Sequence, residues 1–156
     1  MIAKSNENEE YAGMGTTFVA ATVSDHKVTV MNIGDSRLYY GNKELKQITV
    51  DHSYVEELIN AGMLDREQGR LHPKKNVITR ALGSQAATPD FFEFEAQEGY
   101  LLLCSDGLSN MISDDELKEL LLDHDQIANK TNQMIARANE YGGKDNISLV
   151  IVDLKR

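Results

Sequence analysis

Three short runs of β-branched and aromatic residues, separated only by turn-forming residues, dominate the first third of the sequence. They cover residues 16–23, 27–33 and 37–41, and the tripeptides SDH and GDS divide them. These residue types favour extended backbone, and turn residues at this spacing are typical of strands joined by tight turns. The sequence GNKE then turns the chain into LKQI. We therefore expect an antiparallel meander at the start of the fold.

A helix is expected next. Ser53 and Glu56 form a capping-box pair at the start of residues 53–61, and Gly62 follows where a C-terminal cap belongs. Residues 64–76 are polar and show no hydrophobic periodicity. We interpret them as a mobile excursion from the body of the protein.

Two further strands are expected in the middle of the chain. In residues 91–95 aromatic and acidic residues alternate, which places Phe92 and Phe94 on one face. Residues 99–104, GYLLLC, are almost wholly apolar, so this strand should be buried on both faces. We expect a hairpin to join the two strands.

Helix signals dominate the final third. Ser113 and Glu116 form a second capping-box pair, which predicts a helix to about Leu122. A longer helix is predicted for residues 126–141, and a last strand for residues 146–154. The longer helix has one apolar stripe: Ile127, Met134, Ile135, Ala138 and Tyr141.

The order of these elements indicates an α+β protein with antiparallel sheets, because the strands come first and the helices collect in groups. A length of 156 residues with 41% apolar composition fits one domain with a real core. The sequence holds no nucleotide-binding fingerprint. No G-x-G-x-x-G follows a strand, and GGKD at residues 142–145 lacks the other residues of a P-loop.

The charge balance narrows the choice of partners. The chain carries 16 basic and 25 acidic residues, a net charge of −9, which argues against binding to a phosphate backbone. An acidic excess suits cation binding, although a solvated acidic surface is the commoner explanation. Cys104 is the single cysteine, so no internal disulfide forms. With no signal-peptide pattern or long apolar stretch, we expect a cytoplasmic protein without membrane contact.

Three aspartates stand at the ends of predicted strands: Asp35 in NIGDSR, Asp106 in CSDG and Asp145 in GGKDN. Taken singly, each is ordinary turn chemistry beside Gly, Ser or Asn. If the three strands belong to one sandwich, their ends bring three carboxylates to one rim. Such hard oxygen ligands suit Mg²⁺ or Mn²⁺. A zinc site is disfavoured, because the chain has one cysteine and its four histidines show no paired spacing.

Other polar residues have structural interpretations. Cys104 lacks the arginine six residues later that a cysteine phosphatase requires, since position 110 is Asn. We interpret it as an inert core thiol. We expect Arg37 and Arg80 to form ion pairs, and His52 to anchor the start of the first helix.

Six motifs, in order, resemble those of the bacterial metal-dependent serine/threonine phosphatases of the protein phosphatase 2C family. Together they extend over nearly the whole chain from residue 13. The motifs are GMGTT (13–17), GDSRLYY (34–40), DHSYVEELINAGML (51–64), HPKKNVITRALG (72–83), LLLCSDGLSNMISDDEL (101–117) and GGKDNISLVIV (142–152).

The resemblance implies an α-β-β-α sandwich with a binuclear Mg²⁺/Mn²⁺ centre at one end of two sheets. Asp106 and Asp145 match two ligands of one metal, and Asp35 matches a residue that, with the SDG aspartate, binds a third ion in bacterial members. Residues 53–75 match the flap, a segment linked to substrate choice. The implied reaction is hydrolysis of phosphoserine or phosphothreonine by a metal-activated water, with phosphorylated proteins and a cognate kinase as partners.

The chain departs from the family pattern at its start. The early phosphate-binding Arg, the first acidic metal motif and the ADGMGGH motif have no counterpart here. YAGMGTT is no substitute, because Ala12 stands where the acid would be and Thr17 where the histidine would be. We therefore expect residues 1–156 to be a single, N-terminally truncated domain without the first strands and helix. By itself it should be inactive or severely impaired.

Two alternatives of other classes remain. In the first, the chain recognises phosphoproteins or a kinase through the flap without turnover. In the second, it is a non-catalytic fragment whose exposed strand edges drive self-association. Metal titration separates the phosphatase from both. Phosphopeptide binding without hydrolysis supports the first alternative, and a concentration-dependent mass supports the second.

Overall fold

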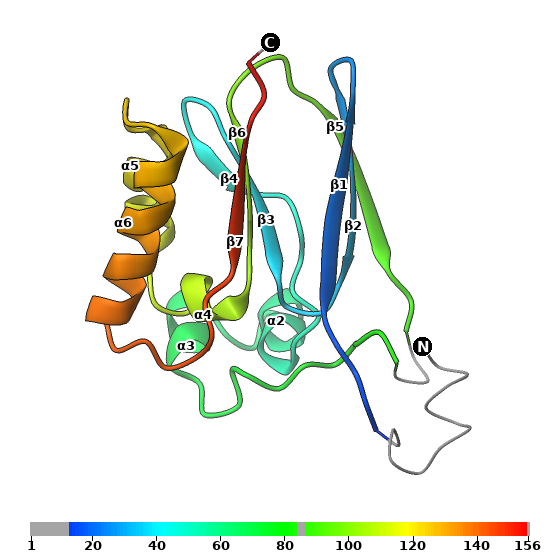
Figure 1. Cartoon of the computed structure of the whole chain (residues 1–156). Helices are drawn as coiled ribbons and strands as arrows, with labels where there is room; N and C mark the ends of the chain where they lie inside the picture. Colours follow the sequence, from blue (N-terminus) through cyan, green and yellow to red (C-terminus); the bar gives the residue numbers. More distant parts are fainter. Residues whose placement is uncertain (1–12, 84–86, 156) are drawn as a thin grey trace.

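Two antiparallel β-sheets pack face to face in the computed structural model, which describes residues 13–83 and 87–155 (Figure 1). One sheet has the strand order β1-β2-β5, formed by Phe18–Ser24, Lys27–Ile33 and Asp90–Glu95. The other has the order β4-β3-β6-β7, formed by Leu45–Gln47, Arg37–Gly41, Tyr100–Cys104 and Leu149–Asp153. The predicted α+β class with antiparallel sheets is confirmed.

The three-stranded sheet follows the predicted alternation. Phe92 of β5 lies opposite Val30 of β2, and Phe94 lies opposite Val28. Both valines are fully buried, whereas Phe91 on the other face is 65% exposed. The alternating side chains therefore form one half of the core between the sheets, since successive residues of a strand point to opposite faces.

The predicted meander is correct for the antiparallel pairs β1–β2 and β3–β4 but wrong between them. Strand β2 pairs with β1 and β5, whereas β3 pairs with β4 and β6, so β2 and β3 belong to different sheets. Strands β5 and β6 also belong to different sheets, so the predicted hairpin between them is wrong. The GDS segment crosses from one sheet to the other, and Gly34 within it adopts φ +109°, a backbone conformation that favours glycine.

Helices α5 (Asp114–Leu122) and α6 (Ile127–Glu140) cover the outer face of the four-stranded sheet (Figure 1). Strand β6 is buried on both faces, as predicted. The stripe on α6 is only partly correct, because Ile127 and Tyr141 at its ends are 37% and 49% exposed. The core under the helices contains Tyr39, Leu102, Cys104, Leu108, Ile112, Leu117, Leu121, Met134 and Ala138.

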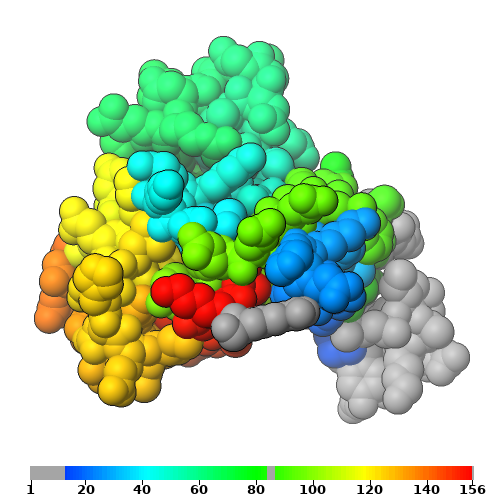
Figure 2. Space-filling view, turned by 90° about the horizontal axis from the view of Figure 1, so that it is seen from above, coloured from blue at the N-terminus to red at the C-terminus, as the bar shows by residue number. Residues whose placement is uncertain are grey.

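The layers are distinct when the molecule is viewed along the sandwich. In Figure 2 the C-terminal strand (red) lies between the helical layer (yellow to orange) and the β1–β2 hairpin (blue). No helix among the described residues is long and apolar enough to cross a membrane.

Two helices lie at the lower end of the sheets in Figure 1, α2 (Tyr54–Asn60) and α3 (Arg66–Leu71). Helix α2 begins at Ser53 as predicted, although Glu56 bonds to Arg66 and does not complete a capping box. Helix α3 was not predicted. It lies within the segment expected to be an irregular excursion, and its capping box joins Asp65 and Gln68.

Candidate metal centre

Strand register brings the three predicted aspartates to one end of the four-stranded sheet. Arg37, the first residue of β3, pairs with Cys104, the last of β6, and Cys104 pairs with Leu149, the first of β7. Asp35 lies just before Arg37, Asp106 just after Cys104, and Asp145 shortly before Leu149. The predicted convergence at one rim therefore follows from the pairing of these three strands.

The S-D-G sequence after β6 ties the Asp145 loop to the sheet. The backbone N–H of Ser105 donates to Ser148 O at 2.9 Å, and the Ser148 N–H donates to Ser105 Oγ at 3.0 Å. Gly107 allows the loop to approach, because a Cβ at this position would lie 2.2 Å from Asn146 O. Asp106 opens the short helix α4 (Asp106–Ser109) between these two contacts.

The acidic side chains interact electrostatically. Burial, followed by the negative charges of Asp106 and Asp51, raises the pKa of Asp35 to about 6. Burial and then the charge of Asp145 raise the pKa of Asp106. Asp106 is thus coupled to both of the other predicted ligands. The charge of Asp106 disfavours ionisation of Asp35, and the charge of Asp145 disfavours ionisation of Asp106, so a bound cation would relieve this repulsion.

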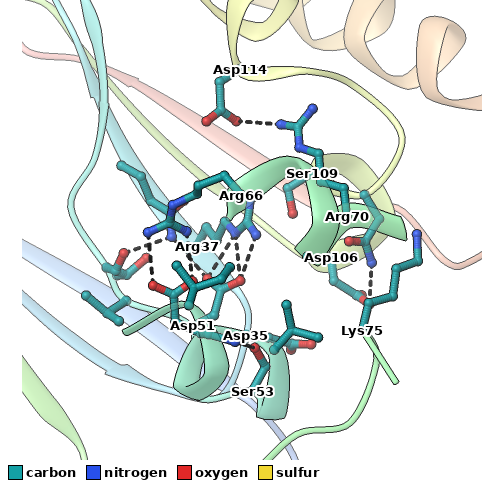
Figure 3. A pocket seen from close by; sticks show the side chains of 18 residues that line it. Asp35, Arg37, Asp51, Ser53, Arg66, Arg70, Lys75, Asp106, Ser109 and Asp114 are labelled. Carbon is teal, nitrogen blue, oxygen red and sulfur yellow. Dashed lines mark hydrogen bonds and ion pairs between the residues drawn. The ribbon is translucent and has the colours of Figure 1, made fainter. Parts of the chain in front are cut away.

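The flap faces these acids across a polar cavity of about 310 Å³ (Figure 3). Asp35 and Asp106 line it from the sheet end, whereas Asp145 does not line it. Cationic side chains line it as well: Arg37, Arg66, Arg70 and Lys75. Arg66 pairs with Glu56 at 2.8 Å, and Arg70 lies 3.7 Å from Asp114. The cavity lining therefore combines acidic and basic side chains.

The arginines predicted to form ion pairs do so. Arg37 donates from Nε and Nη2 to Asp51 at 2.7–3.0 Å and from Nη1 to the Tyr39 hydroxyl at 2.9 Å. Arg80 donates to Asp90 at 3.1 Å. Cys104 is 3% exposed, and burial raises the pKa of its thiol to about 12, in accord with an inert core residue.

The donor set fits a hard divalent ion that keeps several waters. Within residues 13–83 and 87–155, no group of three or more His, Cys, Asp and Glu side chains is arranged to hold a metal ion together, so the candidate ligands come in pairs. The pairs Asp35–Asp106 and Asp106–Asp145 supply only carboxylate oxygens, the ligands that Mg²⁺ and Mn²⁺ prefer. Asn110 donates to Asp106 Oδ2 at 3.2 Å and orients it.

Sequence reasoning missed two features of the cavity. The first is the row of flap cations, since the polar sequence around Arg66 and Arg70 has no hydrophobic periodicity and predicts an irregular segment. The Asp65–Gln68 spacing was the available signal, because a helix there places residues four apart on one face. The second is Ser109, which lines the cavity and whose buried Oγ has no hydrogen-bond partner in the part of the chain that the structure describes.

Comparison with known proteins agrees with this geometry. A family profile described as Protein phosphatase 2C matches residues 2–149. The serine/threonine phosphatase stp of Listeria monocytogenes is 40% identical over 156 residues, which is 98% of this chain and 62% of that protein. The protein phosphatase PhpP of Streptococcus pneumoniae is also 40% identical, over 98% of this chain and 63% of that protein. The chain spans about three fifths of the length of these curated relatives.

Two solved phosphatase structures are also similar to nearly the whole chain. The serine/threonine phosphatase PstP of Mycobacterium tuberculosis is 34% identical with a TM-score of 0.93, covering 99% of this chain and 66% of that one. A structure of the PstP catalytic domain in complex with two manganese ions is 33% identical, with a TM-score of 0.87 over 97% of this chain and 64% of that one.

Proposed function

Because this chain belongs to the protein phosphatase 2C family, we propose that the protein hydrolyses phosphoserine and phosphothreonine in other proteins with a metal-activated water. The convergence of Asp35, Asp106 and Asp145 at one sheet end carries the proposal. The substrates are phosphorylated proteins, with a cognate serine/threonine kinase among them. A cytoplasmic location accords with the single cysteine, Cys104.

Each aspartate has a distinct part in the proposal. Asp106 and Asp145 hold one Mg²⁺ or Mn²⁺, and Asp35 with Asp106 holds a further ion. A bound divalent ion supplies Lewis-acid chemistry, since it lowers the pKa of a coordinated water toward about 7 and makes it a nucleophile. The flap, residues 53–75, presents Arg66, Arg70 and other cations that attract the substrate's phosphoryl oxygens.

Residues 1–156 form one unit in this proposal, and their carboxylates make a partial metal site. We therefore expect the chain by itself to hydrolyse p-nitrophenyl phosphate with Mn²⁺ slowly or not at all. The physical reason is that three carboxylates neutralise and position two ions poorly. Turnover comparable to that of a full-length relative would contradict this expectation.

Metal titration tests the site directly. Mn²⁺ binding to the chain, measured by calorimetry, should be abolished by Asp106→Asn and weakened by Asp145→Asn or Asp35→Asn. Asp106→Asn should have the largest effect, because Asp106 is coupled to both other carboxylates. Asp153→Asn at the opposite end of β7 is the matched control and should bind as the wild type does. Equal affinity in all four variants would refute the site.

A further inference from the structure

His52 holds the residue immediately before Asp35 by two hydrogen bonds. Its backbone N–H donates to Gly34 O at 2.9 Å, and its Nδ1 accepts from the Gly34 N–H at 3.1 Å. The imidazole is 4% exposed, so water competes poorly for these contacts. Both backbone polar groups of Gly34 are therefore held by one residue from a segment 18 positions later.

The ring tautomer follows from these contacts. A backbone N–H can only donate, so Nδ1 must be the bare acceptor nitrogen and Nε2 must carry the hydrogen. Nε2 then donates to Asp90 Oδ2 at 3.0 Å. Arg80 donates to the other oxygen of Asp90 at 3.1 Å, which fixes that carboxylate. Arg80, Asp90 and His52 thus form a chain of contacts that ends on Gly34.

The loop that contains Gly34 and Asp35 also packs closely against Thr17. Gly34 adopts φ +109°, and a Cβ built on it would lie 2.4 Å from Thr17 Cγ2. The next residue is Asp35, whose half-buried carboxylate faces the negative charges of Asp106 and Asp51. Repulsion among these acids favours movement of Asp35 away from Asp106. The His52 contacts oppose that movement because they fix the peptide from which Asp35 extends.

We propose that His52 is a positioning residue, which through its Nδ1 contact with Gly34 holds Asp35 within reach of the ion that Asp106 binds. The role rests on the metal site proposed above. His52 itself does not line the cavity that Asp35 and Asp106 line. Residues that orient metal ligands through hydrogen bonds act in a comparable way. Their loss typically lowers metal affinity by about 10- to 100-fold.

Two substitutions at His52 separate positioning from folding. His52→Asn keeps an oxygen acceptor near the place of Nδ1, whereas His52→Leu removes the acceptor and keeps the side chain apolar and large. Ser53→Ala is the matched control, because it removes the neighbouring cap bond to the Glu56 N–H without touching Gly34. The measurements are Mn²⁺ affinity, hydrogen exchange of the Gly34 amide and the ¹⁵N spectrum of the imidazole.

His52→Leu should weaken Mn²⁺ binding by roughly 10-fold or more and accelerate Gly34 exchange, while core amides in β6 exchange as in the wild type. His52→Asn and Ser53→Ala should keep near wild-type affinity. A protonated Nδ1 in the wild-type spectrum, or equal losses in His52→Leu and Ser53→Ala, would overturn the proposal. If the wild type binds no Mn²⁺, the metal site fails, and His52 then loses its positioning role even where Gly34 exchange confirms the contact.

Discussion

Asp106 is the residue on which the proposed chemistry depends most. It lies at the C-terminal end of β6, coupled to Asp145 on one side and to Asp35 on the other. The same coupling that suits a cation makes the ionised residue unfavourable without one, because burial and like charge both raise its pKa. A folded-state pKa above the unfolded value means that stability declines as pH rises through it.

Asp106→Asn should therefore raise the melting temperature in EDTA at neutral pH by a few degrees. The substitution removes the charge and keeps an oxygen that accepts from Asn110. The same variant should gain little stability from Mn²⁺, whereas the wild type should gain more as the ion concentration rises. Differential scanning calorimetry with and without Mn²⁺ checks both effects. A lower melting temperature in EDTA would contradict the argument.

The pKa of Asp90 shifts in the opposite direction from that of Asp106. The hydrogen bond from His52, aided by the charge of Arg80, lowers the pKa of Asp90 from its ordinary value of 3.8. Its stabilising contribution is present above that value and is lost as pH falls through the lower folded-state pKa. The side chain is 39% exposed, which limits the size of the effect.

Asp90→Asn should therefore melt below the wild type at neutral pH, and the difference should close in acid. Melting curves of both proteins at about pH 7 and about pH 3 measure the gap. Asp153→Asn, an exposed site at the far end of β7, controls for the loss of one negative charge. A gap that stays constant across this range would show that the charge of Asp90 contributes nothing.

Among the elements, α5 and α6 are joined by a buried cation. The Lys130 side chain is fully buried, and its Nζ donates to Leu121 O at 2.7 Å and lies 3.9 Å from the Tyr100 ring centroid. Helix α5 has no basic residue in its own last turn. Lys130 therefore satisfies a carbonyl at the C-terminal end of α5, where the helix dipole favours positive charge.

Lys130→Met should destabilise the protein by about 1–3 kcal/mol, because it leaves the Leu121 carbonyl buried without a donor. Urea denaturation measures the change. Lys118→Met is the matched control, since Lys118 forms an exposed pair with Glu44 and should cost below about 1 kcal/mol. Equal midpoints for the two variants would rule out a structural role for the buried ammonium.

At the scale of the whole molecule, the candidate centre exists because separate segments approach closely. The loop of Asp145 lies against α4 only because Gly107 has no side chain. The Asp35 loop is similarly held between Thr17 and His52. These contacts join the start, middle and end of the chain, so no single segment carries the site.

Gly107→Ala should displace the Asp145 loop, with a cost of about 1–3 kcal/mol from overpacking and a loss of Mn²⁺ affinity. The obstacle is backbone, Asn146 O at 2.2 Å from the new Cβ. Gly15→Ala is the control, because its nearest neighbour would lie 3.5 Å away. Calorimetry and Mn²⁺ titration report stability and affinity separately. Unchanged binding in Gly107→Ala would show that Asp145 does not need this approach.

The amino-acid sequence alone determined the local elements and the chemical type of the site. Alternation placed Phe92 and Phe94 on the core face, Ser53 and Ser113 started their helices, and three aspartates at strand ends indicated a hard cation. These features depend on contacts within a few residues, so local propensity and capping specify them.

Tertiary structure decided which strands share a sheet and what faces the acids. Strands β2 and β3 separate although they are neighbours in sequence, because long-range pairing with β5 and β6 sets the sheets. The flap cations and the His52 contact to Gly34 depend likewise on segments brought together by packing. Such contacts join residues far apart along the chain, so short-range sequence patterns do not predict them.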